Sequence, residues 1–443
     1  MSFNTLPPLL ATAFQRLASR LHVSSAARLP TLLFGALFAK GRRTVTSWFL
    51  AAAITADFRN AYNTVWAAGR RAPSLAAANL PAVERCLGPD ARVLRLALDD
   101  TPTRRWGPHV EGAGLHHNPN RGPAGERFLY GHLWVTLALL ACHPRHGVRA
   151  LPLLALLYVR RKDVERIAPD HRPVFRTKLE LAGELLRWLH AWRADRYERV
   201  EIAVDGAYAK RPFLREARRL DVVVFSRLRR DAALHSLPRP RRARQPGRPA
   251  VYGEDRLNLA MRAGQTRGWQ KVSCVQYGER VTKTVKTFVA TWRPAGGAIR
   301  VVIVKEESGW LPFFCTDPEA SVESVLEAMA DRGAIEETFR EVKEVWGAQQ
   351  QQVRNLEANK GCFNINLWMH ALVEAWAWDV PEDELVDRSA CPWDGEPRRA
   401  SHADKRKALQ KLVLREELRA LLRRPCEPGE IDDRVEALLQ LAL

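Results

Sequence analysis

The stretch "ARVLRLALDDTP", residues 91–102, decides the fold. It is apolar over most of its length, with the turn residues "LGPD" before it and Thr-Pro after it, so it is predicted to be a β-strand. The strand leads into two adjacent aspartates, Asp99 and Asp100. Carboxylates at a strand end lie where loops open onto solvent, which is a common place for catalysis in sheets flanked by helices.

The segments that follow predict the rest of a sheet. Two apolar runs of strand length, "HLWVTLALLACH" and "LPLLALLYVRR", come after a loop rich in Gly, His and Pro, and with the first strand they indicate an antiparallel meander. A helix over 173–193 comes next, then the strand "RVEIAVDGAY", a short helix "AKRPFLREARRL" and the strand "DVVVFSRL". This order of elements predicts an α/β fold with a mixed sheet of the ribonuclease H-like kind.

The chain divides into four regions by pattern. Residues 1–88 carry helical periodicity with basic residues at helix ends, and are predicted to be a helical N-terminal DNA-binding domain. Residues 89–225 and 309–375 form the predicted catalytic domain. Residues 226–308 interrupt it as a basic insertion whose β-branched, alternating pattern indicates strands. A helical C-terminal region is predicted over 376–443.

Composition points to a polyanionic partner. Among the 443 residues, 46% are hydrophobic, and 69 Lys and Arg outnumber 50 Asp and Glu to give a net charge of +19. Nucleic acid is the leading candidate for the partner, and an acidic membrane surface is the second. No apolar stretch of about 18 residues indicates a membrane span. Seven scattered cysteines without a CxxC pair argue against a zinc site or a disulfide framework, so a cytoplasmic location is expected.

The stretch "DRGAIEETFREVKEVWG", residues 331–347, is predicted to be an amphipathic helix. At roughly 100° per residue its apolar side chains fall on one stripe, while Arg332, Glu336 and Lys343 fall on a line beside that stripe. Ion pairs between successive turns on the solvent side of the helix are one explanation of this line. A functional site beside the buried stripe is the other.

Three acidic positions suggest metal-dependent chemistry. The aspartates at 99–100, Asp205 after the strand "VEIAV" and Glu336 on the helix converge if that helix packs on the same sheet. Clustered carboxylates repel one another unless cations neutralise them, and their hard oxygen atoms suit Mg²⁺ or Mn²⁺. Two such ions can activate a water or a 3′ hydroxyl and stabilise the oxygen that leaves a phosphodiester. Taken singly, each aspartate is also explained as a turn former.

These blocks resemble a DDE transposase of bacterial insertion sequences. Its last catalytic residue lies in a Tyr-x2-Arg-x3-Glu-x6-Lys signature, which Arg332, Glu336 and Lys343 match, while Met329 replaces the tyrosine. The segments "LALDDT" and "AVDGAYAK" resemble the two aspartate blocks of that family. Asp205 and Glu336 lie about 130 residues apart, as in members that carry a β-strand insertion. The resemblance covers about residues 90–375.

The resemblance implies a set of site residues. Asp100, Asp205 and Glu336 would hold two Mg²⁺ or Mn²⁺ ions, with Asp99 as the alternative first ligand because only one of two successive strand residues faces the site. The cationic side chains of Arg332, Arg340 and Lys343 would contact DNA phosphates. Trp310, near the end of the insertion, would receive a flipped base, although a role in the core explains it equally well.

The function that follows is that of a transposase acting on double-stranded DNA, with no membrane partner. It would bind the terminal repeats of its insertion sequence as a homodimer, cleave at the element ends by hydrolysis and join the 3′ ends to target DNA. Two alternatives stay open. One is a ribonuclease H-like nuclease that cleaves without joining, and the other is a non-catalytic DNA-binding protein derived from a transposase.

Overall fold

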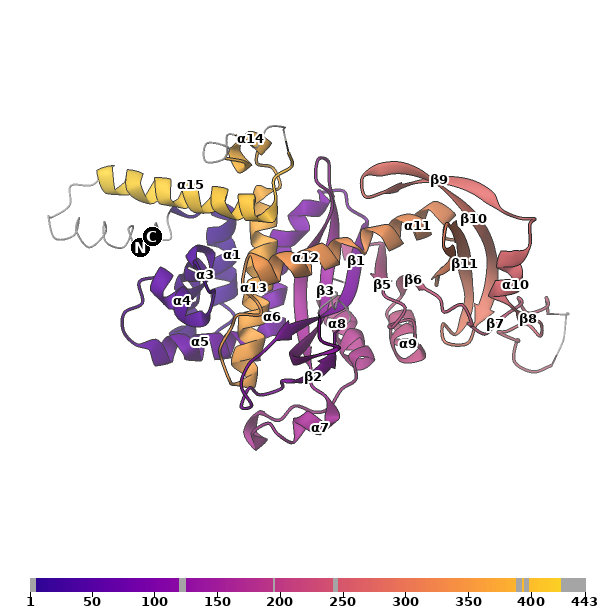
Figure 1. Cartoon of the computed structure of the whole chain (residues 1–443), viewed down its shortest axis with the longest axis horizontal. Coiled ribbons are helices and arrows are strands. Elements are labelled where there is room, and N and C mark those ends of the chain that lie inside the picture. The colour runs from indigo at the N-terminus through magenta and orange to yellow at the C-terminus, as the bar shows by residue number, and fades with distance from the viewer. Residues whose placement is uncertain are drawn as a thin grey trace.

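A single twisted sheet forms the centre of the molecule (Figure 1). The computed structural model describes residues 5–118, 125–193, 196–241, 246–387, 393 and 398–423. The strands of the ribonuclease H-like part of this sheet are β1 (Val93–Arg104), β2 (Gly114–His117), β3 (Phe128–His143), β4 (Gly147–Tyr158), β5 (Arg199–Val204) and β6 (Val222–Arg227).

The order and direction of these strands confirm the predicted ribonuclease H-like mixed sheet. β3 lies between β4 and β1 and runs antiparallel to both, which is the predicted meander. β1 then pairs in parallel with β5, and β5 pairs in parallel with β6. The parallel connections are made by α8 (Lys178–Arg193) and α9 (Arg211–Arg219). The carboxyl ends of β1 and β5 therefore lie at one edge of the sheet.

The insertion extends the same sheet. β12 (Gly309–Cys315) pairs with β6 on one side and with β11 (Gly297–Glu306) on the other, so hydrogen bonding continues into β10 (Glu279–Trp292). The remaining strands are β7 (Leu234–His235), β8 (Arg256–Leu257) and β9 (Gln270–Gln276), with α10 (Leu259–Gly264) between β8 and β9. In Figure 1 the β9–β10 hairpin arches back over α11 (Val322–Asp331) toward the centre of the molecule.

Helices cover both faces of the central sheet and fill the opposite end of the molecule. α12 (Ala334–Glu344) lies on one face, and α13 (Leu356–Ala377) is almost wholly buried between the sheet and the N-terminal helices. The other helices are α1 (Pro8–Ala18), α2 (Val23–Ala26), α3 (Leu29–Phe38), α4 (Val45–Ala51), α5 (Phe58–Arg70), α6 (Ala72–Glu84), the 3₁₀ turns η2 (Arg85–Leu87) and η3 (Pro169–His171), α7 (Arg161–Val164), α14 (Glu382–Leu385) and α15 (His402–Arg423).

Two glycines allow α5 and α13 to approach closely. A Cβ atom on Gly361 would lie 2.0 Å from the carbonyl oxygen of Val65, and one on Gly69 would lie 1.7 Å from that of Glu357. The N-terminal helices are thus packed against the catalytic region through backbone contact. Every helix among the described residues is too short or too polar to cross a lipid bilayer.

The observed elements differ from the predicted ones at their ends. β1 continues to Arg104, so Asp99 and Asp100 lie inside a strand, because β3 pairs with it beyond both aspartates. The predicted helix over 173–193 begins only at Lys178. The helix predicted over 331–347 starts at Ala334, after a break at Arg332 and Gly333 that separates it from α11. Residues 424–443 of the predicted C-terminal region lie outside the described residues.

Candidate active site

The helix α12 places Glu336 at the edge of the sheet. The apolar stripe predicted for this helix is buried: Ile335, Phe339, Val342 and Trp346. Ile335 and Phe339 pack on Ala97 of β1 in one apolar cluster. Glu336 lies in the first turn of α12, where the helix dipole favours a negative charge, and its side chain is 61% exposed.

Asp99 and Asp205 lie on the face of the sheet that α12 covers. Side chains alternate along a strand, and Ala97 packs against α12 while Leu98 packs into the cluster that contains the α8 side chains. Asp99 therefore faces the same way as Ala97. In the parallel register Leu98 is opposite Val204, so the next residues, Asp99 and Asp205, are side by side.

Arg332 joins the acidic residues of this face. Its guanidinium donates to Asp99 at 2.7 Å and to Glu336 at 2.8 Å. Burial opposes the charged form of Arg332, but the carboxylates of Asp99, Glu336 and Asp205 outweigh that effect and raise its pKa. Burial, together with the nearby negative charges of Asp100 and Asp205, raises the pKa of Asp99 to about 6 even though Arg332 lowers it.

Asp100 faces the other side of the sheet. Its carboxylate accepts from the ammonium of Lys178 at 2.9 Å and from the hydroxyl of Tyr208 at 2.8 Å. Burial and the negative charge of Asp100 hold the pKa of Tyr208 well above its usual value. The structure thus brings Asp99, rather than Asp100, into contact with the Arg332 that also binds Glu336.

The side chains predicted to contact DNA differ in their exposure and in their contacts. Lys343 has no hydrogen-bond or ion-pair partner among the described residues, and burial lowers its pKa to about 8. Arg340 is largely exposed and lies 3.5 Å from Glu337. Trp310 is partly buried beneath Arg230, whose guanidinium lies 5.0 Å from the ring centre and donates to the Trp310 carbonyl. Of the four predicted contacts, only Arg340 is thus largely exposed: Arg332 is held by Asp99 and Glu336, and Lys343 and Trp310 are partly buried.

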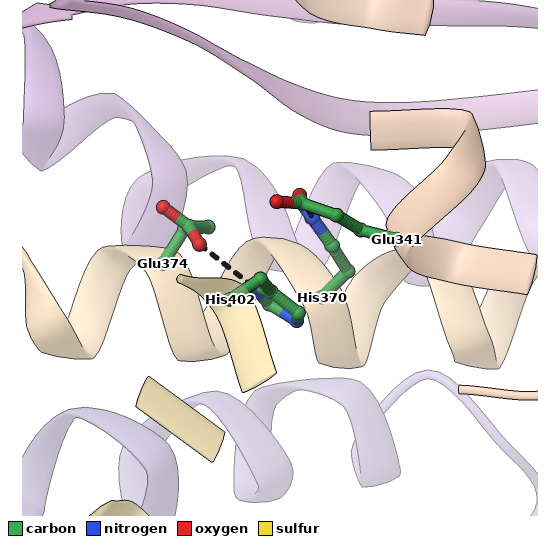
Figure 2. Close-up of side chains that lie close together, drawn as sticks. All are labelled: Glu341, His370, Glu374 and His402. Carbon is green, nitrogen blue, oxygen red and sulfur yellow. Dashed lines mark hydrogen bonds and ion pairs between the residues drawn. The ribbon is translucent and has the colours of Figure 1, made fainter. Parts of the chain in front are cut away.

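A second group of possible metal ligands, which sequence reasoning missed, lies behind α12 (Figure 2). Within the described part of the chain, this is the one set of three or more candidate ligands whose atoms all lie within 4.8 Å of one another: Glu341, His370, Glu374 and His402. They come from α12, α13 and α15, and no short spacing in the sequence marks them. The three predicted carboxylates are not gathered as closely as this.

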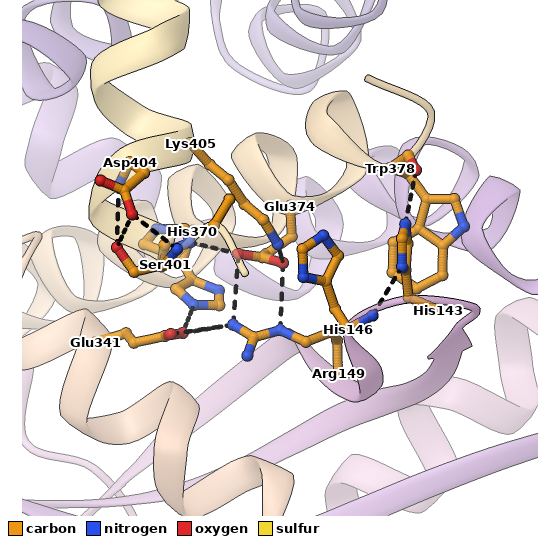
Figure 3. A network of polar contacts seen from close by, with 12 residues as sticks. His143, His146, Arg149, Glu341, His370, Glu374, Trp378, Ser401, Asp404 and Lys405 are labelled. Carbon is orange, nitrogen blue, oxygen red and sulfur yellow. Dashed lines mark hydrogen bonds and ion pairs between the residues drawn. The ribbon is translucent and has the colours of Figure 1, made fainter. Parts of the chain in front are cut away.

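Most donor atoms of this second group already meet cations or hydrogen-bond partners, and Nδ1 of His370 is the exception (Figure 3). Arg149 of β4 contacts Glu341 at 2.9 Å and Glu374 at 3.3 Å. The Lys405 ammonium lies 2.7 Å from Glu374, and the Trp346 indole donates to Nε2 of His402 at 2.7 Å. A metal ion would have to displace these groups, so we interpret the cluster as a buried ion-pair network.

The pKa shifts of His402 and Glu374 agree with a buried ion-pair network. His402 donates through Nδ1 to Glu374, and since its Nε2 accepts from Trp346, its ring is neutral. Burial and the neighbouring His370 lower the pKa of His402 to about 4. Burial opposes ionisation of Glu374, but Lys405 and Arg149 outweigh it and hold its pKa well below the usual value. The network ties α12 to α13, α15 and β4.

One of the comparisons with known proteins identifies a family. The family model described as "DDE superfamily endonuclease" matches residues 16–294, which is more than half of the chain. The matched segment contains Asp99, Asp100 and Asp205 and ends before Glu336. No curated protein matches the sequence. The chain belongs to the DDE superfamily of endonucleases.

Proposed function

We propose that this chain is a transposase that binds the terminal repeats of its own insertion sequence, cleaves DNA at the ends and joins the 3′ ends to target DNA. The observation that carries the proposal is the placement of Asp99, Asp205 and Glu336 around Arg332 on one face of a ribonuclease H-like sheet. Family membership supports endonuclease chemistry on DNA. The proposed working form is a homodimer that holds both ends.

The proposed metal ligands are Asp99, Asp205 and Glu336. Their carboxylate oxygens are the hard donors that Mg²⁺ and Mn²⁺ prefer. Asp205 uses one oxygen to accept from the backbone of Ala207, and Glu336 uses one to accept from Arg332; among the described residues the second oxygen of each meets no donor. When bound, the ions would supply an activated nucleophile and stabilise the departing oxygen.

This assignment replaces Asp100 with Asp99 as the first ligand. Asp100 is paired with Lys178 and Tyr208 across the sheet, and its proposed role is to fix the end of β1 against α8 and the turn before α9. We expect Asp99→Asn to abolish end cleavage and Asp100→Asn to retain a measurable rate. Complete loss in Asp100→Asn together with activity in Asp99→Asn would return the first ligand to Asp100.

The chain's cations are proposed to position the DNA. Lys343 is a partly desolvated ammonium that forms no ion pair with the described residues and feels only the charge of the neighbouring Glu344, which leaves it free to contact a phosphate. Arg332 and Arg340 would contribute from the same helix region, and Trp310 would stack on an unpaired base. Removing a cation that contacts a phosphate should reduce the slope of log affinity against log salt concentration by about one unit.

The test uses purified protein and a labelled duplex that carries the element's own ends, with a scrambled duplex as control. Wild type is compared with Glu336→Gln and with Glu198→Gln, a matched change at an exposed position directly before β5, at the opposite end of that strand from Asp205. We expect Mg²⁺-dependent nicking at the ends by wild type and Glu198→Gln, and binding without nicking by Glu336→Gln.

The products separate the proposal from its alternatives. Joining of the cut 3′ ends to a target plasmid supports a transposase. Nicking without joined products would support a nuclease that cleaves only. End binding without nicking in any variant, with Mn²⁺ also tried, would support a non-catalytic DNA-binding protein and would leave Glu336 as an ordinary surface acid.

A further inference from the structure

The turn between β9 and β10 places a tyrosine where the backbone disfavours it. Gln276 pairs with Glu279, so the hairpin turns through only two residues, Tyr277 and Gly278. Both have positive φ, 55° and 84°, as in the tight hairpin turns that prefer Asn, Asp or Gly at the first position. A bulky side chain in this left-handed region strains the backbone.

The described residues cover little of the Tyr277 side chain, so packing does little to compensate for that strain. The Tyr277 side chain belongs to a residue that is 78% exposed, which makes it one of the most exposed large hydrophobic residues of the described structure. A residue kept in an unfavourable conformation with its side chain in solvent indicates a role outside folding, because the strain would otherwise be relieved by a single substitution.

The hairpin holds Tyr277 at the start of the catalytic helix. The Val275 amide donates to Glu327 of α11 at 3.0 Å, and Cys274 is buried in the apolar cluster that contains Val325. The tip of the hairpin is therefore fixed over the junction between α11 and α12. A Cβ atom on Gly333 would lie 3.6 Å from Cε1 of Tyr277, so the ring lies directly beside this glycine.

Gly333 is three residues before Glu336. Both residues line one surface groove, and Tyr277 lines it too. The groove has a volume of about 900 Å³ and is bordered by Tyr277, Gly333, Glu336 and Arg340. Met329, at the position where the signature has a tyrosine, packs instead into the apolar cluster beneath the hairpin. The aromatic hydroxyl that borders this groove thus comes from the insertion.

We propose that Tyr277 is a DNA-contacting residue that positions the strand entering the acidic site, with its hydroxyl donating to a backbone phosphate next to the cleaved bond. A neutral hydroxyl adds a hydrogen-bond donor at this place without adding a second cation that competes with Arg332 for Glu336 and Asp99. The hydrogen bond to a charged phosphate is of the stronger kind. The inference rests on the proposed function and assigns it a further substrate contact.

The experiment compares Tyr277→Asn and Tyr277→Phe with wild type and Glu198→Gln in three measurements: thermal midpoint, affinity for the end duplex, and single-turnover nicking in Mg²⁺. Asn fits the left-handed turn, so Tyr277→Asn should raise the midpoint, by about 1 °C or more in a chain of this size, while nicking falls about tenfold. Tyr277→Phe should keep the wild-type midpoint and lose several-fold in nicking.

A substitution that stabilises the protein and impairs the reaction distinguishes a substrate contact from a structural role. Nicking by Tyr277→Asn at the wild-type rate would overturn the proposal, and so would a lowered midpoint, which would mean that the ring stabilises the fold. If wild type does not nick, a photo-reactive phenylalanine analogue at position 277 decides the matter in a binding assay. A crosslink within a few nucleotides of the element end supports the contact even then, and no crosslink to bound DNA refutes it.

Discussion

Replacing the buried acid Glu374 with glutamine tests whether the charge network holds α12 in place. The Glu374 side chain has no exposed surface and accepts from three groups: His402 at 2.6 Å, Lys405 at 2.7 Å and Arg149 at 3.3 Å. Glutamine has the same shape but only one acceptor oxygen. Its amide nitrogen must then face either His402 or the two cations, which are donors themselves.

The expected loss follows from the ions left behind. Glu374 is the ion-pair partner that the described residues provide for Lys405, whose side chain is only 4% exposed. Removing one member of a buried pair typically costs roughly 3–5 kcal/mol, because the other charge stays buried without compensation. Arg149 keeps Glu341 and Glu337, so we expect a value near the lower end of this range, about 3 kcal/mol.

Urea unfolding followed by tryptophan fluorescence measures this loss, since Trp346 donates to His402 inside the network. The control is Glu416→Gln, which removes an exposed pair with Arg419 and should change stability by less than about 0.5 kcal/mol. The double variant Glu374→Gln with Lys405→Met should recover at least about 1 kcal/mol relative to Glu374→Gln alone. A loss below about 1 kcal/mol in Glu374→Gln would refute the network as a source of stability.

Three further predictions concern pH and packing. His402 has a lowered pKa in the folded chain, so the stability it contributes is present above about pH 6.5 and is lost as the pH falls toward 4. The urea midpoint of wild type should therefore fall more steeply over this pH interval than the midpoint of His402→Gln. Parallel curves for the two proteins would contradict the lowered pKa. The lowered pKa of Lys343, about 8, predicts that affinity for the end duplex falls between pH 7 and 9 as the ammonium loses its proton. Lys343→Arg should remove this fall, because arginine keeps its charge. An equal fall in affinity in both proteins would argue against a phosphate contact. Gly361→Ala would drive a Cβ atom to 2.0 Å from the Val65 carbonyl oxygen, so differential scanning calorimetry should show a destabilisation of roughly 1–3 kcal/mol or more, while an unchanged transition would mean that α5 and α13 are not packed as described.

The fold could be predicted because its signals are local. Apolar runs of strand length, a helix between each pair of parallel strands and turn residues at their ends are all visible within short windows of sequence. The choice between Asp99 and Asp100 could not be made in this way. It depends on which side of β1 meets α12, and that is decided by Ala97 packing on Ile335, more than 200 residues away.

The buried network was beyond prediction for the same reason. Its members, among them Arg149, Glu341, Glu374 and Lys405, come from elements far apart in the chain, and each alone looks like a solvated charge. Tyr277 is a different case. Two residues, "YG", between alternating strands are typical of a tight hairpin turn, and tyrosine is unusual at the first of these positions. The sequence does not show which residues lie beside the turn, so it does not show what the tyrosine contacts.

The two charge systems of α12 have a joint consequence for the proposed chemistry. Beyond Glu336, the helix ends in Glu344 and carries Glu337 and Glu341 on the side toward β4. Arg149 contacts both of these last two acids. Their negative charge is thus largely cancelled within the protein, whereas Glu336 is 61% exposed and shares Arg332 with Asp99. The uncompensated negative potential is concentrated at the edge where Asp205 also lies. We therefore expect a divalent cation to bind at that edge and not on the side of α12 facing Arg149, because there the protein already provides the cation.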